Sequence, residues 1–240
     1  MRKSECESIR YFPVEHLIKH PKSNDNIIFI GNIGAERLWS TENEFKIPYI
    51  HDIEKKRIIN CNDEFMLYLA DEKDVVVLRH DIDREFADYL KSYAVKIPKI
   101  YTLSTKQDDL TLGELILTDN NLMQILSKKE SNNTKQTTYL LPYAVTEIEE
   151  EISRIVGIDI LNGTHKESAR FNNKAIIRNI ARQINIKTTD GELCNNSSEA
   201  LITYEKLKKN FSIIVAKELY GVSGKGLLLI NNQQEFNEFY

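Results

Sequence analysis

The residues best suited to chemistry lie near the end of the chain, where three glycines fall within six positions. Residues 216–227 read AKELYGVSGKGL, so that Lys217 precedes the glycine cluster and Lys225 lies inside it. A lysine and the backbone N–H groups of a glycine-rich loop can bind a phosphate, because glycine lets the backbone approach an anion closely. The segment predicts either a phosphate-binding loop or a plain surface hairpin, since glycines also gather in tight turns.

Two common nucleotide-binding motifs do not fit this loop. A P-loop requires Ser or Thr after Gly-Lys, whereas Lys225 is followed by Gly226. The dinucleotide fingerprint has the order G-x-G-x-x-G, and the order here is G-x-x-G-x-G. Both motifs lead into a helix, whereas the apolar run LLLI at 227–230 predicts a strand. We therefore expect a glycine-rich hairpin.

Lys217 belongs to the strand that leads into this hairpin. Side chains alternate along a strand, so Val215 and Lys217 point to the same face. If that face is buried, the ammonium group needs an anion to pair with it, because an unpaired buried charge is costly. A bound phosphate would supply the pairing. An exposed lysine on a solvated face is the alternative.

Lys174 is a second candidate phosphate ligand. It follows Asn172 and Asn173, which are good helix N-caps, so it should lie in the first turn of a helix. A cation is disfavoured there by about 0.3–1 kcal/mol unless an anion is held at the same helix end. A solvated lysine is the alternative here as well.

The first 165 residues predict alternating strands and helices, which favours an α/β fold with a mostly parallel sheet. Thr146 and Glu149 form a capping box for a helix that Gly157 ends. Apolar and β-branched runs predict the strands, and helical spacing predicts the other helices. The expected strands are 26–31, 74–78, 99–103 and 139–142, and the expected helices are 84–93, 112–126 and 147–157.

The pattern changes after the polar stretch NGTHKES at 162–168, so we expect a domain boundary near residue 165. Helices are expected at 172–183 and, after the Asn196 and Glu199 cap, at 197–209. Strands are expected at 211–216 and 227–230, on either side of the glycine loop. The predicted domains are 1–165 and 166–240.

Residues 172–231 resemble the opening of an ATP-grasp fold. In that family a lysine at a helix start and a lysine on a later strand precede a glycine-rich hairpin; Lys174 and Lys217 match these positions. The preceding region resembles the Rossmann-like pre-ATP-grasp domain, including the strings FIGN at 29–32 and LLPY at 140–143. More narrowly, the chain resembles bacterial ATP-grasp ligases that join amino acids to peptides or carrier proteins, in peptide or natural-product biosynthesis.

This resemblance implies an ADP-forming ligase. ATP phosphorylates a carboxylate, an amine or thiol attacks the acyl phosphate, and ADP and phosphate leave. The resemblance also implies that Lys174 and Lys217 bind the ATP phosphates and that the loop backbone shields the γ-phosphate. The implied nucleotide-binding residues of the loop are Gly221, Val222, Ser223, Gly224, Lys225 and Gly226.

The family's magnesium ligands and adenine-binding hinge come after this hairpin, where the sequence continues only as NNQQEFNEFY. Glu235 and Glu238 share a helix face there, but a solvated helix end is the simpler interpretation. We therefore expect an incomplete ATP-grasp lid subdomain of two helices and a hairpin, with magnesium bound outside this sequence. The alternative to an enzyme is an inactive assembly module that needs a partner chain. Exposed strands would favour self-association, or a partner chain, at residues 211–240.

Composition and charge indicate which kinds of partner and which cellular location to expect. The net charge of −4 gives no reason to expect nucleic acid or an anionic membrane as a partner. No apolar run of about 18 residues occurs, and the amino-terminal residues lack the apolar core of a signal peptide. The three cysteines, Cys6, Cys61 and Cys194, are far apart, which indicates reduced thiols and a cytoplasmic location.

Three other patterns have both a chemical and a structural interpretation. The Asp81-x-Asp83 pair could bind a metal, although either carboxylate could instead cap the next helix. His16 and His20 have helical spacing for a metal pair, and a surface pair is the simpler reading. The GNIG segment at 31–34 could line a ligand site at the end of a strand, or be a plain turn.

Overall fold

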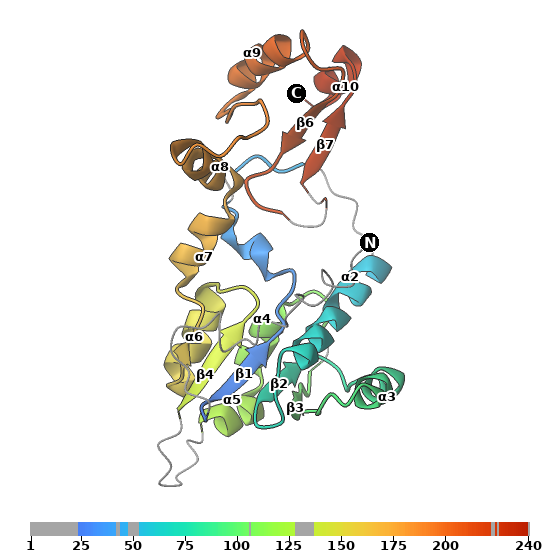
Figure 1. Ribbon diagram of the computed structural model, residues 1–240, viewed down its shortest axis with the longest axis vertical. Helices are drawn as coiled ribbons and strands as arrows, with labels where there is room; N and C mark the ends of the chain where they lie inside the picture. Colours follow the sequence, from blue (N-terminus) through green and yellow to red (C-terminus); the bar gives the residue numbers. More distant parts are fainter. Residues whose placement is uncertain are drawn as a thin grey trace, which may run out of the picture. The chain divides into compact units, whose positions relative to one another are not determined.

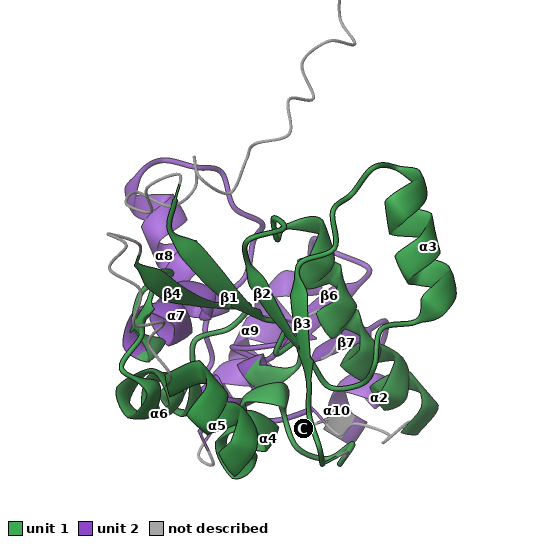
Figure 2. Ribbon diagram, turned by 90° about the horizontal axis from the view of Figure 1, so that it is seen from below, with its two compact units in different colours: residues 1–35, 52–165 green, residues 36–51, 166–240 purple. Residues whose placement is uncertain are grey.

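A computed structural model describes residues 24–41, 44–47, 53–105, 107–127, 137–221, 224 and 226–239. The chain divides into two compact units, one made of residues 1–35 and 52–165 and the other of residues 36–51 and 166–240 (Figure 2). The predicted boundary at residue 165 placed the stretch after residue 35 in the first domain, whereas here it groups with the second unit. The identities of the two domains stay predictions.

The first unit contains a five-stranded sheet in the order β3-β2-β1-β4-β5 (Figure 1). Every neighbouring pair in this sheet is parallel. This confirms the α/β class with a parallel sheet. The strands are β1 (Asn26–Ile30), β2 (Val75–Leu78), β3 (Lys99–Thr102), β4 (Thr138–Pro142) and β5 (Asp159–Ile160).

The sheet is covered on both faces. Along β1, Ile28 and Ile30 pack in one apolar cluster while Ile27 and Phe29 pack in another, because successive side chains of a strand point to opposite faces. Three helices cover the first cluster: α4 (Leu112–Thr118), α5 (Asn120–Ser127) and α6 (Glu147–Val156) (Figure 2). The second cluster, on the other face, is covered by η2 (Cys61–Tyr68) and α3 (Arg84–Ser92). A strand buried on both faces reads as a continuous apolar run, as NIIFI does.

The predicted cap of α6 is confirmed. The Thr146 side chain accepts a hydrogen bond from the helix, the Glu149 carboxylate accepts one from the Thr146 N–H, and Gly157 ends the helix with φ 68°. This left-handed conformation costs glycine little.

The single helix expected at 112–126 is two helices instead. Asp119 leaves the helical conformation with ψ 87° and caps α5, its Oδ1 accepting from the Leu122 N–H at 2.9 Å. Its other carboxylate oxygen accepts from the Ser104 N–H at 3.0 Å. The loop after β3 therefore breaks this helix, and helical periodicity alone contains no sign of that contact.

Three short helices were not predicted from the sequence. They are η1 (Ala35–Trp39), which begins where the first segment of the first unit ends, α2 (Ile53–Asn60) of the first unit, and α7 (His165–Asn172), which begins within the polar stretch at 162–168.

The second unit contains an antiparallel pair, β6 (Ile214–Lys217) and β7 (Leu227–Ile230), with Lys217 opposite Leu227 (Figure 1). The expected hairpin is thus present, although the first strand starts three residues later than predicted. Its helices are α8 (Lys174–Gln183), α9 (Ser197–Leu207) and α10 (Gln233–Phe239). The expected Asn196 cap of α9 is present, accepting from the Glu199 N–H at 2.9 Å.

The apolar cluster of the second unit is small. Its buried members are Tyr204, Ile230 and Phe236, with the Tyr204 and Phe236 rings stacked at 4.2 Å between centroids. Ile214, Ala216 and Leu228 pack against them from the hairpin. One face of the hairpin is therefore covered by α9 and α10.

Candidate functional site

Lys174 is the first residue of α8, and Asn173 is its N-cap. The Asn173 Oδ1 accepts from the Ala175 and Ile176 N–H groups at 3.0 and 3.2 Å. The Lys174 N–H donates to the Leu219 carbonyl at 3.0 Å. The first N–H groups of this helix are therefore occupied by the chain itself.

The Lys174 side chain contacts the start of the glycine loop. Its ammonium group donates to the Gly221 carbonyl at 2.9 Å and lies 3.5 Å from the Leu219 carbonyl. Residues more than forty positions apart in the sequence thus meet at one point. Backbone carbonyls, rather than a carboxylate, hold the lysine in this structure.

Lys217 lies on the exposed face of the hairpin. Ile214 and Ala216 turn toward the apolar cluster, so Val215 and Lys217 share the opposite face, and Val215 is 41% exposed. The two side chains do point the same way, but that face is not buried. Lys217 therefore lies on an exposed face, which was the alternative prediction, because the core formed on the other side of the strand.

The two lysines form a positively charged pair. Burial lowers the pKa of Lys174, the Glu218 carboxylate acts in the opposite direction, and the positive charge of Lys217 lowers it further. The positive charge of Lys217 makes the charged form of Lys174 less favourable, and an anion near the Lys174 ammonium would favour that form.

Glu218 fixes the entry to the loop. Its carboxylate accepts from the Ile47 N–H, and its backbone N–H donates to the Gly226 carbonyl at 2.9 Å. A Cβ at Gly226 would lie 2.5 Å from a carboxylate oxygen of Glu218, and Gly226 has φ 67°. A side chain at this position would therefore be strained and would displace Glu218.

Tyr220 links the loop to two other segments of the second unit. Its hydroxyl accepts from the Asn173 amide at 3.3 Å, and its ring lies 6.2 Å from that of Trp39. Neither Asn173, beyond its capping role, nor Tyr220 nor Trp39 was predicted to take part in a site. The two asparagines before α8 signalled a cap only, and nothing local signals the contact with Tyr220.

The loop itself is only partly described. Gly221 and Gly224 have φ values of 129° and 79°, which favour glycine. Val222, Ser223 and Lys225, which the sequence also predicts to bind nucleotide, lie outside the described residues, and so do Cys6, His16 and His20.

The other predicted side chains have structural roles. Asp83 caps α3 and accepts from the Phe86 N–H at 2.9 Å, as the capping alternative expected. Glu235 accepts from the Asn231 N–H at 2.8 Å at the start of α10, and Glu238 accepts from the Gln234 amide at 3.1 Å. These carboxylates therefore stabilise helix ends.

The GNIG segment is a turn held to the loop after β4. The Asn32 amide donates to the Ala144 carbonyl at 2.7 Å and accepts from the Ala144 N–H at 2.9 Å. Gly31 makes room for Asp63, since a Cβ there would lie 2.6 Å from the Asp63 Cα. Packing thus explains this glycine and asparagine without a ligand.

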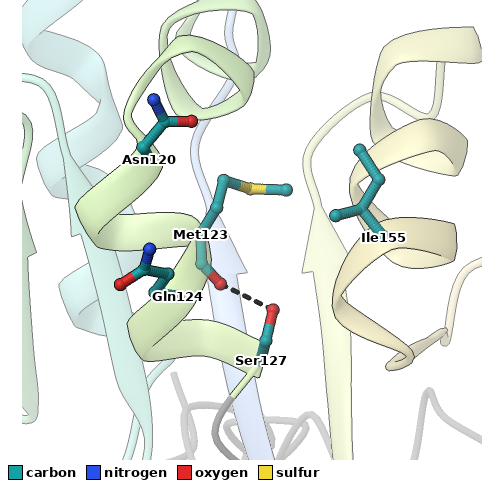
Figure 3. Close-up of a pocket in the computed structure, with 5 residues that line it drawn as sticks. All are labelled: Asn120, Met123, Gln124, Ser127 and Ile155. Carbon is teal, nitrogen blue, oxygen red and sulfur yellow. Dashed lines mark hydrogen bonds between the residues drawn. The ribbon is translucent and has the colours of Figure 1, made fainter.

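Two surface hollows of the first unit are poor candidates for catalysis. Figure 3 shows one between α5 and α6, where Met123 faces Ile155 and the Ser127 hydroxyl donates to the Met123 carbonyl at 2.7 Å. None of its lining side chains titrates near neutral pH. The other contains Cys61, whose pKa is raised by burial and by nearby carboxylates, so its thiol stays protonated at neutral pH.

In the described part of the chain no three His, Cys, Asp or Glu side chains are grouped so as to hold a metal ion. The Glu218 carboxylate beside Lys174 accepts from the Ile47 N–H, so it does not fit a magnesium ligand in this structure. The helices in the described ranges are all too short or too polar to span a bilayer.

Residues 63–158 match the model of the pre-ATP-grasp domain family. This part of the chain is thus similar to pre-ATP-grasp domains. The matched residues include β2, β3, β4 and the helices on one face of the sheet, so the family and the observed parallel α/β fold agree.

A curated relative points to the same family. The chain is 25% identical over 213 residues to the butirosin acyl-carrier protein–L-glutamate ligase of Niallia circulans, a match that covers 88% of this chain and 45% of the relative. Both matches indicate that the chain is similar to ATP-grasp ligases. The chain spans about half the length of that relative. No solved structure matches significantly.

Proposed function

We propose that this chain binds ATP through Lys174 and Lys217 as part of an ADP-forming carboxylate–amine or carboxylate–thiol ligase. The observation that carries the proposal is the contact of the Lys174 ammonium with the Gly221 carbonyl at the start of the glycine loop, where the positive charge of Lys217 also acts on Lys174. The similarity to a ligase and the pre-ATP-grasp domain support ATP-dependent ligation as the reaction class.

The proposed reaction has two steps. A substrate carboxylate attacks the γ-phosphorus of ATP, so that an acyl phosphate forms and ADP leaves. An amine or a thiol then attacks the acyl carbon, and an amide or a thioester forms as phosphate departs with the bonding electrons. Negative charge gathers on phosphoryl oxygens in the first step, so fixed ammonium groups nearby lower its barrier.

The roles of individual groups follow from their positions. Lys174 and Lys217 would neutralise the phosphate oxygens, and Gly221, Gly224 and Gly226 would let the loop backbone approach them. Val222, Ser223 and Lys225 belong to this proposal from their place in the sequence. Since the relative's name includes an acyl-carrier protein, an amino acid together with a carrier protein or peptide is the proposed substrate pair.

The test is ATP binding to the full chain, measured by isothermal titration calorimetry with and without magnesium. We expect Lys174→Ala and Lys217→Ala each to weaken binding at least tenfold, because each removes one charge that faces the phosphates. Lys187→Ala is the matched control, since Lys187 is an exposed lysine of the same unit, in the loop after α8. An ATP affinity that is unchanged in both Lys174→Ala and Lys217→Ala would contradict the proposal.

A second function is favoured by the exposed face of the hairpin. Val215, Leu227 and Leu229 are 41%, 41% and 60% exposed and lie side by side, since Val215 pairs with Leu229. Such a face fits an assembly module that associates with itself or with a partner chain through residues 211–240. In this alternative the lysine variants leave association intact.

A further inference from the structure

We propose that Glu218 is a positioning residue of the proposed nucleotide site, because its carboxylate ties the entry of the glycine loop to the segment at 44–47 of the same unit. The inference rests on the proposed function and deepens it. Glu218 was not among the residues predicted to bind nucleotide. Its role is to hold the loop in place, not to touch ATP.

Glu218 lies at the base of the loop. It directly follows Lys217, the last residue of β6, and its backbone N–H donates to the Gly226 carbonyl at 2.9 Å. This hydrogen bond comes directly after the last strand pair, in which Lys217 lies opposite Leu227. The two ends of the loop are therefore joined at Glu218 and Gly226.

The carboxylate of Glu218 lies between two backbone segments. Its Oε1 accepts from the Ile47 N–H, and its Oε2 would lie 2.5 Å from a Cβ at Gly226. Because Gly226 has no side chain, the carboxylate can lie against the loop and still reach Ile47. A hydrogen bond to an ionised acceptor is stronger than one between neutral groups. This bond therefore fastens the loop entry to the segment at 44–47.

A second contact joins the loop entry to the same part of the unit, residues 36–51. The ring of Trp39 lies 6.2 Å from that of Tyr220. The Gly221 carbonyl, which follows, accepts from the Lys174 ammonium at 2.9 Å. The loop entry is thus held by two segments of the unit. A loop that is already ordered loses less conformational entropy when a ligand binds, so these contacts favour phosphate binding at the loop.

The negative charge of Glu218 acts on phosphate binding in the opposite direction. Burial lowers the pKa of Lys174 and the Glu218 carboxylate raises it, so the two side chains are close enough to interact. A phosphate that approached Lys174 would be repelled by this carboxylate. Replacing Glu218 by alanine would therefore remove both a tether and a repulsion. Glutamine removes only the charge, because its amide oxygen can still accept from the Ile47 N–H.

The experiment measures the ATP affinity of the full chain by calorimetry for Glu218→Gln, Glu218→Ala and Glu218→Met. Glu218→Met keeps the length of the side chain but has no oxygen to accept from the Ile47 N–H. All three variants lack the charge, so a difference among them reports the tether. We expect Glu218→Ala and Glu218→Met to bind ATP about two- to tenfold more weakly than Glu218→Gln, because one hydrogen bond that orders the loop is lost.

Trp39 is the one tryptophan of the sequence, and it reports on the loop entry without nucleotide. Its quenching by acrylamide should be greater in Glu218→Ala and Glu218→Met than in Glu218→Gln, because the Tyr220 ring beside it is held less firmly. Glu238→Ala and Glu238→Gln are the matched controls, since Glu238 is an exposed glutamate of α10 in the same unit. These two control variants should bind ATP with the same affinity.

Equal ATP affinities of Glu218→Gln, Glu218→Ala and Glu218→Met, while the lysine variants lose binding, overturn this inference alone. Weaker binding without a change in Trp39 quenching overturns it as well, because the loop entry would then keep its position. If Lys174→Ala and Lys217→Ala both bind ATP like the wild type, the proposed function fails, and this inference fails with it.

Discussion

Asp63 is a buried carboxylate whose hydrogen-bond partner and neighbours are clear in the structure. It lies beside Gly31, and its Oδ2 accepts from the Arg79 N–H at 2.6 Å. Burial raises its pKa to about 6, although the hydrogen bond from Arg79 acts in the opposite direction. Its place between the ends of β1 and β2 makes it a structural group with a measurable pH response.

The free energy of unfolding should decrease as pH rises from about 4 to about 6. In this range the Asp63 carboxyl ionises in the unfolded chain, whereas in the folded protein it keeps its proton. The loss from Asp63 is on the order of 3 kcal/mol and is complete above its folded pKa. Asp63→Asn should remove this part of the pH dependence, since the amide oxygen can still accept from the Arg79 N–H. Urea unfolding of both proteins between pH 4 and pH 7 measures it.

The control for this prediction is Asp159→Asn, at an exposed aspartate of β5. It should leave the pH dependence of the unfolding free energy as in the wild type. A slope in Asp63→Asn equal to that of the wild type would contradict the assigned pKa.

At the scale of single elements, helix caps explain several carboxylates that resemble catalytic groups. Asp83, Glu149 and Glu235 each accept from a backbone N–H at the start of a helix. The first N–H groups of a helix have no partner within it, so acceptors are favoured there. A catalytic carboxylate and a capping carboxylate are the same residue type in the sequence, so only the contacts in the structure distinguish the two roles.

Asp83→Ala should lower the free energy of unfolding by about 1 kcal/mol, because α3 loses its N-cap. Asp83→Ser should recover most of this loss, since a serine hydroxyl can accept the same N–H. Asp81→Ala, two residues earlier and exposed, should change stability by less than about 0.5 kcal/mol. Equal losses for Asp81→Ala and Asp83→Ala in chemical unfolding would argue against the capping role.

At the scale of the whole molecule, the two units differ in how much apolar surface they bury. The first has two large clusters of buried side chains, and the second buries three large side chains in its described part. In the second unit, apolar side chains are exposed on both α8 and the hairpin. These include Ile177, Ile213, Val215, Leu227 and Leu229. A surface of this kind is typical of one that another chain or segment covers.

We expect the chain to associate through the hairpin face, with a sedimentation coefficient that rises with protein concentration. Leu229→Ser should shift the equilibrium toward the monomer, because Leu229 is 60% exposed in the middle of β7. Leu193→Ser is the matched control, since Leu193 is 54% exposed in the same unit but precedes α9. A wild-type chain that sediments as a monomer at all concentrations would contradict this prediction.

The sequence alone determined what depends on near neighbours along the chain. The β-branched run at 75–78 can bury both its faces, and Thr146 with Glu149 can cap a helix without help from distant residues. The parallel α/β class, the cap of α6 and the pairing of the hairpin strands were therefore predictable. Lys174 and Lys217 were paired by a resemblance to a family, and their role in a site stays a prediction.

Tertiary structure decided which groups actually meet. Alternation places Val215 and Lys217 on one face, but the position of Tyr204 and Phe236 decides that this face is the exposed one. The break at Asp119 depends on Ser104. The contacts of Tyr220 with Asn173 and Trp39 join segments more than forty residues apart. Such contacts form only when the chain has folded, because no local pattern fixes the distance between residues so far apart in the sequence.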